Sequence, residues 1–365
     1  MYHFFKQLLT KRILHAQHAL ISYNQTKNTR KYIKDSLRRV YIPQLSQRQI
    51  KAAKDYYMAR GYNLNNTYWH RYYTGVTGEF HEDYVPLDIF RSMISFKLNQ
   101  RKQWPALLDK NLSYNLFKEF KQPKRIVQNV NGFYFVNNKI VSQAVAEDAC
   151  NINNKTLVIK PTLESGKGKM VEIFMVENNQ TSVKNYSVTE LFKRYKKDFI
   201  VQEAVEQNEA LNALNPSSLN TLRMVSYLRD DGVHILSSAV RIGEPGSKTD
   251  NFSGGGMFCG IKKNGQLKEK GHTKSGEIKD TTLNGAILKD IKIPNYDKVK
   301  TMVEAMHLKI PYFRIVSWDI GIDKLNEPVF IEYNSCYQGI EIQIPNGPLF
   351  GKFADEILAL GREPY

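Results

Sequence analysis

The sequence predicts a helical N-terminal region followed by an α+β body whose sheets are mainly antiparallel. Three observations predict this class. The N-terminal third has apolar residues at helical spacing, whereas short apolar runs separated by turn residues follow from Arg125. One of those turns, Asn131-Gly132, is a strong hairpin signal. Near the end, residues 313–336 form two alternating runs around the turn-forming sequence Lys324-Leu325-Asn326-Glu327.

The composition is that of a globular protein with room for several cores. The chain has 365 residues, enough for two or three domains, and its 42% hydrophobic and 24% charged residues are ordinary for such proteins. No apolar run approaches the ~20 residues that span a bilayer, and basic residues interrupt the apolar start, so we do not expect a signal peptide. Cys150, Cys259 and Cys336 are far apart, and we expect free thiols in a reducing cytoplasm.

The positive charge is concentrated in the N-terminal third. Residues 1–105 contain 18 Lys and Arg against 6 Asp and Glu, so they carry +12 of the net charge of +16. Such a segment indicates an anionic partner, which could be nucleic acid, acidic lipid headgroups or an acidic polymer; a solvated helical surface is an equal alternative. A helix is expected over residues 2–20, which could lie on a membrane but more often would dock on its own protein.

Further N-terminal elements can be assigned in order. Ser46 is expected to cap a helix over residues 51–60. The aromatic-rich run at residues 62–84 could stack on bases or sugars, although core packing is the commoner use. Helices that start at a proline are expected at residues 86–99 and 105–120.

The body alternates strands with a few helices. Runs rich in β-branched and aromatic residues predict the strands, and Ser187 is expected to cap one helix. Strands are expected at residues 125–130, 133–136, 156–161, 170–176, 199–205, 221–229 and 233–243, and another after the polar loop at residues 250–256. Helices are expected at residues 142–150, 188–195 and 296–308, and a last helix from Pro348.

The hairpin at residues 313–336 contains a candidate metal site. A four-residue loop places Asp319 opposite Glu332, with Asn334 on the same face, because side chains alternate along a strand. Two carboxylates ~5 Å apart repel each other by about 3 kcal/mol at an effective dielectric of ~20, and a divalent cation between them reverses the sign. Oxygen donors favour Mg²⁺ or Mn²⁺ over zinc. The alternative is a solvated face with incidental acids. The opposite face is expected in the core: Trp318, Ile320, Ile322, Val329, Ile331 and Tyr333.

Two lysines and a glycine loop are candidates for phosphate binding. Lys160 ends a strand, and Gly166 and Gly168 follow it in a loop before the next strand. Glycines let backbone N–H groups approach phosphate oxygens, and the lysine supplies a positive charge. Neither the P-loop nor the dinucleotide-binding fingerprint fits this loop, and an ordinary hairpin is an equal alternative. Lys110, early on a helix, carries no information by itself.

Two arginines on neighbouring strands form another candidate site. If the turn at Asp230-Asp231-Gly232 has three residues, Thr221 pairs with Arg241, and Arg223 and Arg241 share a face that calls for an anion. A two-residue turn would place the two arginines on opposite faces. The polar loop around Asn251 is either a substrate loop or a linker.

These pieces occur in an order that resembles the ATP-grasp superfamily of carboxylate–amine ligases. The segments LLDK, SLNTLRMVSY, DNFSGGG, GHTKSG, SWDIG and VFIEYNS are similar to its sugar-transfer-associated branch, over about residues 104–365. The resemblance implies an ATP-grasp fold, in which two α+β lobes with mainly antiparallel sheets clasp ATP. It divides the chain into a helical, basic N-terminal region (1–104), a small lobe with the glycine-rich loop (105–202) and a large lobe with the metal site (203–365).

The resemblance also implies ATP and Mg²⁺, or Mn²⁺, as cofactors, and a role for each candidate residue. The phosphate and metal ligands would be Lys110 and Lys160 on the α- and β-phosphates, and Asp319, Glu332 and Asn334 on the metal. The other contacts would be the backbone of Glu203 and Val205 around adenine, Glu209 on the ribose, and Arg223 and Arg241, assisted by Asn251, on the γ-phosphate and the acceptor carboxylate.

By this resemblance the protein would be an ATP- and Mg²⁺-dependent carboxylate–amine ligase that forms an amide through an acylphosphate. The acid would be a uronic acid or another acidic group on a glycan precursor, and the amine an amino acid, in surface polysaccharide modification. The alternatives are an ATP-dependent phosphotransferase acting on a sugar, and a non-enzymatic nucleic-acid or membrane-surface binding protein. We expect a cytoplasmic ligase without a nucleic-acid partner, whose basic N-terminus could meet the inner face of the membrane or an acidic polymer.

Overall fold

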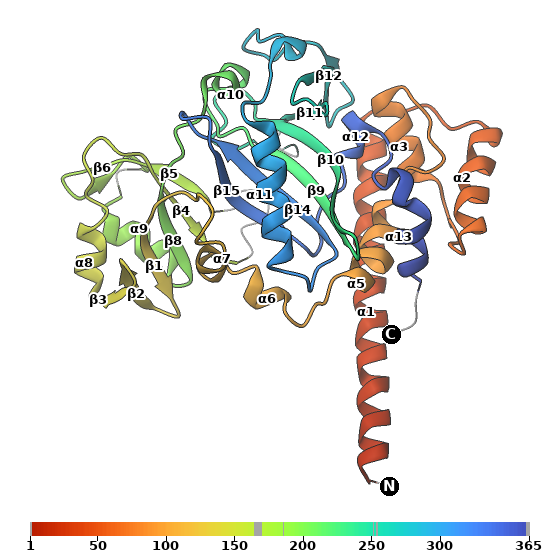
Figure 1. The fold of residues 1–365 in the computed structure, drawn as a ribbon, viewed down its shortest axis with the longest axis horizontal. Coiled ribbons are helices and arrows are strands. Elements are labelled where there is room, and N and C mark those ends of the chain that lie inside the picture. Colours follow the sequence, from red (N-terminus) through yellow and green to blue (C-terminus); the bar gives the residue numbers. More distant parts are fainter. Residues whose placement is uncertain (1, 164–169, 185, 251, 253–254, 363–365) are drawn as a thin grey trace.

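The computed structural model describes residues 2–163, 170–184, 186–250, 252 and 255–362 (Figure 1). A helical N-terminal region precedes two antiparallel sheets, which confirms the predicted α+β class. Gly166, Gly168 and Asn251 lie outside the described residues. Among the helices in the described part of the chain, none is both long and apolar enough to cross a membrane.

The N-terminal region begins with α1 (Tyr2–Arg39), whose first part projects away from the rest of the protein (Figure 1). The helix predicted at residues 2–20 therefore continues to Arg39. Its second half packs against the protein, where Ile33 is fully buried. The docked part of α1 is therefore its second half, and the first part projects.

The next two helices are α2 (Gln47–Ala59), which begins four residues before the predicted range of 51–60, and α3 (Tyr68–Thr77), which forms within the aromatic run. Helix α2 starts at the predicted cap, where Ser46 and Gln49 form a capping box. In α3, Trp69 is buried in the core. The interpretation of this run as core packing is therefore confirmed.

The two proline-led helices are interrupted. The first is a helical segment with a π-helical centre: α4 (Leu87–Ile89), η1 (Phe90–Ile94) and α5 (Ser95–Leu98). The second is divided into α6 (Trp104–Leu107) and α7 (Lys110–Leu116). The division occurs because the Asp109 side chain accepts hydrogen bonds from the N–H groups of Asn111 and Leu112, which caps α7.

The smaller sheet has six strands in the order β3-β2-β1-β8-β4-β5. Its strands are β1 (Arg125–Val130), β2 (Phe133–Val136), β3 (Lys139–Val141), β4 (Leu157–Pro161), β5 (Glu172–Phe174) and β8 (Phe199–Glu203). The accompanying elements are α8 (Gln143–Asp148), α9 (Val188–Tyr195) and a two-stranded ribbon of β6 (Val176–Glu177) and β7 (Gln180–Thr181). One hydrophobic core joins the helices to the sheet through Leu191, Phe192 and Phe199.

The larger sheet has seven strands in the order β13-β12-β11-β10-β9-β14-β15. Its strands are β9 (Leu222–Arg229), β10 (Gly232–Ile242), β11 (Met257–Ile261), β12 (Leu267–Thr273), β13 (Ile278–Lys279), β14 (Ile315–Ile322) and β15 (Pro328–Asn334). The helical elements around it are α10 (Glu209–Leu214), η4 (Leu288–Asp290), α11 (Tyr296–Leu308), α12 (Gln343–Asn346), η5 (Gly351–Phe353) and α13 (Ala354–Leu360).

Separate cores cover the two faces of the larger sheet. On one face, Val303 of α11 packs with Trp318 of β14. On the other face, Tyr73 of α3 shares a core with Val225 of β9 and with the C-terminal helix α13. The N-terminal helices are thus part of the same packed unit as the larger sheet, although they are far from it in sequence.

A β-bulge in the β9–β10 hairpin corrects the effect of its turn. Gly232 pairs with Arg229, so the turn has two residues and not three. The register shifts by one residue between Ile235 and Ser237, and the Arg241 N–H then donates to the Thr221 carbonyl oxygen at 2.8 Å. The pairing predicted for a three-residue turn is therefore present for a different reason.

The β14–β15 hairpin shows the same compensation. Pro328 pairs with Ile322, so the loop has five residues and the predicted four-residue loop is wrong. A register shift that leaves Ile331 as the extra residue restores Asp319 opposite Glu332. Because of this bulge, Ile331 lines a cavity and is not in the core, where the regular alternation had placed it.

Candidate active site

A cavity of about 160 Å³ lies between the two sheets and combines apolar with charged walls. Its apolar lining comes from both sheets and from the chain between them: Val158, Val171, Ile173, Val205, Leu219 and Ile331. Its charged lining includes Lys160, Glu203, Arg241, Lys248, Asp250 and Glu332. Apolar and charged walls side by side suit a ligand that has both an apolar part and an anionic part.

Strand pairing separates two functional parts of this cavity. Leu157 pairs with Glu203, and Lys160 pairs with Ile200. Three residues of strand correspond to ~10 Å. The segment 203–205 and the Lys160 ammonium group are therefore positioned at different ends of the cavity.

The acids of the β14–β15 hairpin face each other, as predicted. Asp319 pairs with Glu332 on β15 and with Arg223 on β9. Asn334 pairs with Ser317, two residues beyond Glu332 on the same side of the strand. Asp319 is almost fully buried, and Glu332 is partly exposed.

Two arginines bind the buried Asp319. Arg223 donates from Nε to one carboxylate oxygen at 2.6 Å and from Nη2 to the other at 2.9 Å. Arg241 donates from Nη1 to Asp319 at 3.2 Å and from Nη2 to Asp250 at 2.6 Å. Thr221 completes the chain, since both its N–H and its hydroxyl donate to Asp250. The result is a continuous row of alternating charges across β14, β9 and β10.

The surrounding charges determine the protonation of these groups. Burial alone would raise the pKa of Asp319, but the guanidinium groups of Arg223 and Arg241 outweigh burial and hold the pKa below its ordinary value. Burial alone would lower the pKa of Arg241, but Asp250 and Asp319 outweigh it, so this pKa is raised. Arg241 is thus a permanent cation inside the cavity, and Asp319 is an anion at neutral pH.

Lys110 and Lys160 both lie near Glu332 of β15. The Lys110 N–H donates to the Thr162 carbonyl oxygen at 3.1 Å, which ties the start of α7 to the end of β4. The Lys110 Nζ lies 3.8 Å from a Glu332 carboxylate oxygen. The pKa of Lys160 is lowered to about 8, first by burial and then by the Lys110 charge, while Glu332 acts in the opposite direction. Two lysines held this close favour a bound anion between them.

The segment predicted to contact adenine lines the apolar part of the cavity. The Glu203 N–H donates to the Lys124 carbonyl oxygen at 2.8 Å, and the Glu203 carboxylate pairs with Lys124 Nζ at 2.9 Å. Among the described residues, no hydrogen bond is made by the Val205 N–H. Glu209, by contrast, is exposed in the first turn of α10 and does not line the cavity. The structure does not bring this ribose candidate to the site.

Sequence reasoning missed several contributors. Asp250 begins the polar loop that was singled out, and Thr221 was named as the strand partner of Arg241, but the contacts of Asp250 with Arg241 and Thr221 were not predicted. The apolar lining, which includes Leu219, was missed because these residues are ordinary core-type residues in sequence. The one signal in the sequence for the contact of Asp250 with Arg241 is that an acidic side chain follows the strand that carries this arginine.

The donor set fits a hard divalent cation. In the described part of the chain no three His, Cys, Asp or Glu side chains cluster as a metal site. The predicted ligands Asp319, Glu332 and Asn334 are two carboxylates and one amide. The arginines use three of about four lone-pair positions on Asp319, and Glu332 interacts with the same carboxylate. An ion with so few protein ligands would complete its octahedron with phosphate oxygens and water, as Mg²⁺ commonly does.

Two antiparallel sheets that close on a cavity with lysines, arginines and paired acids define a nucleotide-binding protein of the ATP-grasp type. The chain matches the family described as sugar-transfer associated ATP-grasp over residues 90–357. The match covers most of the chain, so the protein belongs to this family. The predicted family and fold are confirmed.

Several solved structures are distantly similar. The ATP-grasp ligase PsnB, complexed with precursor peptide PsnA2 and AMPPNP, is 12% identical with a TM-score of 0.40, over 73% of this chain and 63% of that chain. The L-amino acid ligase from Bacillus licheniformis is 14% identical with a TM-score of 0.39, over 72% of this chain and 49% of that one. The chain thus spans less than two thirds of the length of these structures. No curated protein matches the chain. The assignment rests on the family match.

Proposed function

We propose that the protein is an ATP- and Mg²⁺-dependent carboxylate–amine ligase that forms an amide. In the first step a carboxylate oxygen of the acid attacks the γ-phosphorus of ATP, the bond between that phosphorus and the β,γ-bridging oxygen breaks, and ADP leaves. In the second step the amine nitrogen attacks the acyl carbon of the acylphosphate, the carbon–oxygen bond to phosphate breaks, and inorganic phosphate leaves. The nitrogen gives up its excess protons to solvent. Both steps depend on positioning and charge stabilisation more than on a protein nucleophile.

One observation carries this proposal. The row Arg223–Asp319–Arg241–Asp250 lies beside Glu332 at one end of a cavity that combines charged and apolar walls. Buried arginines of this kind stabilise a transferring phosphoryl group and an anionic acceptor. A binding module would not require such a costly set of buried charges.

Each group has a role in this scheme. The Val205 N–H would donate to adenine, between apolar residues of the two sheets. Lys110 and Lys160 would neutralise the phosphates, and Arg241 would hold the γ-phosphate against the attacking carboxylate. Bound Mg²⁺, held by Asp319, Glu332 and Asn334, would supply further neutralisation of phosphate charge.

The acid is proposed to be part of a glycan precursor, for example a uronic acid, and the reaction to belong to surface polysaccharide modification. The description of the family as sugar-transfer associated supports this choice. Arginines that face an anion suit a carboxylate acceptor better than a neutral hydroxyl.

The test separates the ligase from a phosphotransferase. Purified protein is incubated with Mg²⁺, ATP, hydroxylamine and glucuronic or galacturonic acid, and hydroxamate and ADP are measured. The proposal expects hydroxamate in proportion to ADP, because hydroxylamine traps the acylphosphate. ADP formed with a sugar phosphate and without hydroxamate would overturn the ligase in favour of a phosphotransferase. ATP that gives no Mg²⁺-dependent rise in Tm would favour a binding protein.

We also propose that the basic part of α1 contacts an anionic membrane surface. The exposed residues Lys27, Lys31, Lys34 and Arg38 follow each other at spacings of three or four along the helix, so they share one side. The double variant Lys27→Glu/Lys31→Glu is expected to lose sedimentation with vesicles rich in anionic phospholipid, while Lys51→Glu on α2 is not. Equal sedimentation of the first variant and the native protein would contradict the membrane contact.

A further inference from the structure

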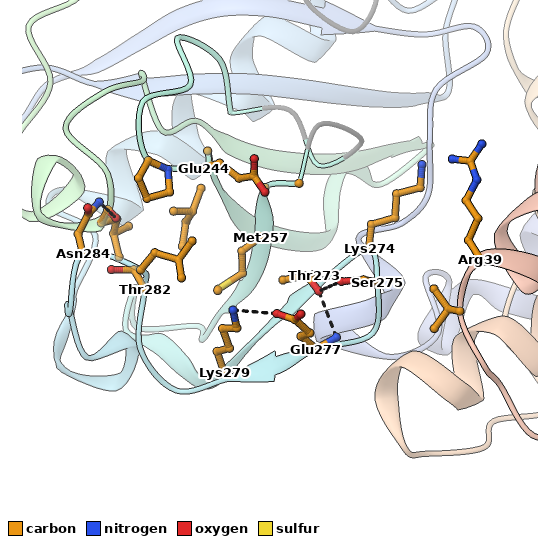
Figure 2. Close-up of a pocket in the computed structure, with 18 of the residues that line it drawn as sticks. Arg39, Glu244, Met257, Thr273, Lys274, Ser275, Glu277, Lys279, Thr282 and Asn284 are labelled. Atoms are coloured by element: carbon orange, nitrogen blue, oxygen red, sulfur yellow. Dashed lines mark hydrogen bonds and ion pairs between the residues drawn. The ribbon is translucent and has the colours of Figure 1, made fainter.

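A second cavity lies at the end of the larger sheet and is more than twice as large as the first. It measures about 360 Å³, which is within the range of small-molecule sites. Its walls come from the last turns of α1, the end of β10, the start of β11 and the connection between β12 and β13 (Figure 2). The N-terminal helix therefore completes a cavity that belongs otherwise to the large sheet.

This cavity shares a wall with the ATP cavity. Arg241 and Ile242 are consecutive on β10, and because side chains alternate, Arg241 faces the ATP cavity while Ile242 lines the second one. Beyond the strand, residues 243–245 line the second cavity and residues 248–250 line the ATP cavity. The two cavities therefore meet at the end of β10 and at the chain that follows it.

The second cavity has cationic side chains on one side and an acidic side chain on another wall. Glu277 and Lys279 pair with each other at 2.8 Å. Figure 2 shows Arg39 and Lys274 on the side next to α1, whereas Glu244 lies away from Arg39 on the wall formed by the end of β10. Among the described residues, the Glu244 carboxylate and the Arg39 guanidinium group form no ion pair.

The N-terminal helices hold Lys274 in place. Its Nζ lies 4.9 Å from the centre of the Tyr32 ring on α1, and its carbonyl oxygen accepts a hydrogen bond from the Tyr72 hydroxyl at 3.2 Å. A cation positioned in this way loses little entropy when it binds an anion. The cationic side is thus preorganised by residues from outside the sheet.

We propose that this cavity binds the amine substrate as a zwitterion, with its ammonium group at Glu244 and its carboxylate at Lys274 and Arg39. This inference rests on the proposed ligase function, which requires an amine beside the acylphosphate. Glu244 lines the second cavity on the stretch of chain between the two cavities, three residues after Arg241, whereas Arg39 comes from α1. The proposal also gives the basic N-terminal region a part in substrate binding.

The first experiment measures binding without ATP. The full chain is titrated with each common L-amino acid, and with its N-acetyl and carboxamide derivatives, by thermal shift and by saturation-transfer NMR. At least one free amino acid is expected to bind, and both derivatives of that amino acid to bind at least tenfold more weakly. Equal binding of either derivative would overturn the zwitterion site. Failure of every amino acid to bind would overturn it as well.

Matched variants locate the site. Glu244→Gln and Arg39→Ala are expected to weaken binding of the same amino acid by at least tenfold. Glu269→Gln on β12 and Arg38→Ala on α1 change exposed residues outside the cavity and are expected to leave it unchanged. If both Glu244→Gln and Arg39→Ala bind normally, the location is wrong. If glucuronic acid competes with the amino acid and depends on Arg39 but not on Glu244, the cavity is the carboxylate site and the proposal is wrong.

The outcomes separate this inference from the ligase proposal. Hydroxamate formation with no amino acid bound in the second cavity overturns the inference and leaves the ligase intact. Amino acid binding that depends on Glu244 and Arg39, in a protein that forms no hydroxamate with any acid, keeps the site and overturns the ligase.

Discussion

The two hairpins at the centre of the larger sheet differ in charge but are built in the same way. The β9–β10 hairpin carries Arg223 and Arg241, and the β14–β15 hairpin carries Asp319 and Glu332; Arg241 and Glu332 line the cavity between the two sheets. The β9–β10 turn has two residues, the β14–β15 loop is one residue longer than predicted, and each hairpin has a β-bulge that returns the charged residues to one face. Because side chains alternate with a period of two, one extra residue changes the face of everything beyond it. The face that carries function is therefore set by the turn and the bulge together.

The comparison also shows why neither hairpin would be stable alone with these residues. Asp319 without Arg223 and Arg241 would be an unpaired buried anion, and the arginines without Asp319 would repel each other. The β9–β14 pairing places opposite charges side by side. The two hairpins therefore depend on each other. Substitutions in one hairpin should change the effect on stability of substitutions in the other.

The largest effect is expected for Asp319→Ala, which removes a metal ligand and leaves both arginines unpaired. We expect ADP release to fall by about 10³-fold or more, and the free energy of unfolding to fall by about 3–5 kcal/mol. The rise in Tm caused by Mg²⁺ and ATP should be lost. Glu327→Ala, in the loop of the same hairpin, is the control. An Asp319→Ala protein that keeps Mg²⁺-dependent stabilisation by ATP would show that the acids of β14–β15 do not hold the metal.

A smaller loss is expected for Arg241→Met in the other hairpin. The variant removes the link between Asp250 and Asp319 and one donor to the γ-phosphate, so ADP release should fall by about 10²-fold. Arg229→Met, near the turn of the same hairpin, should change it little. Steady-state assays at saturating ATP measure both. Equal activity of the two variants would mean that only the acids, and not the arginines, take part in the reaction.

The pH dependence of the KM for ATP tests the role of the Lys160 ammonium group, which belongs to the smaller sheet and not to either hairpin. Its folded-state pKa of about 8 lies below its ordinary value, so above pH 8 the folded protein loses the lysine charge that binds phosphate. The KM for ATP should therefore rise about tenfold between neutral pH and pH 9.5. The Lys160→Arg variant stays charged and should not show this rise. A rise of the same size in Lys160→Arg would assign the titration to another group.

The same lowered pKa predicts a stability effect in the ligand-free protein. Between the folded pKa near 8 and the ordinary pKa near 10.5, the unfolded chain binds more protons at this site than the folded one. The free energy of unfolding should therefore gain a contribution that increases with pH over this interval. Lys160→Met should remove this contribution in urea titrations. An identical pH dependence in the variant would show that Lys160 is not the buried base.

The smallest effect is expected for Ile331→Ala at the bulge. This residue lines the apolar part of the ATP cavity, so truncation should raise the KM for ATP about threefold and leave kcat unchanged. Leu325→Ala, exposed in the loop of the same hairpin, is the control. A large loss of kcat would mean that the bulge positions Glu332 and does not merely contact the nucleotide.

The sequence by itself determined the local features. Alternating apolar residues and turn residues identified both hairpins, and the pair Asp319 and Glu332 indicated an oxygen-lined metal site. Such features follow from interactions between residues close in sequence. The capping box at Ser46 and the core role of the aromatic run around Trp69 were readable for the same reason.

Only the tertiary structure decided how distant parts meet. It brought Lys110 from an interrupted helix to Glu332, placed Asp250 on Arg241, and formed the apolar lining from segments of both sheets. It also fixed the bulges, because a bulge is chosen by the packing of a whole sheet and not by its own residues. The N-terminal helices were placed against the larger sheet by burial of apolar side chains, which acts without regard to sequence distance.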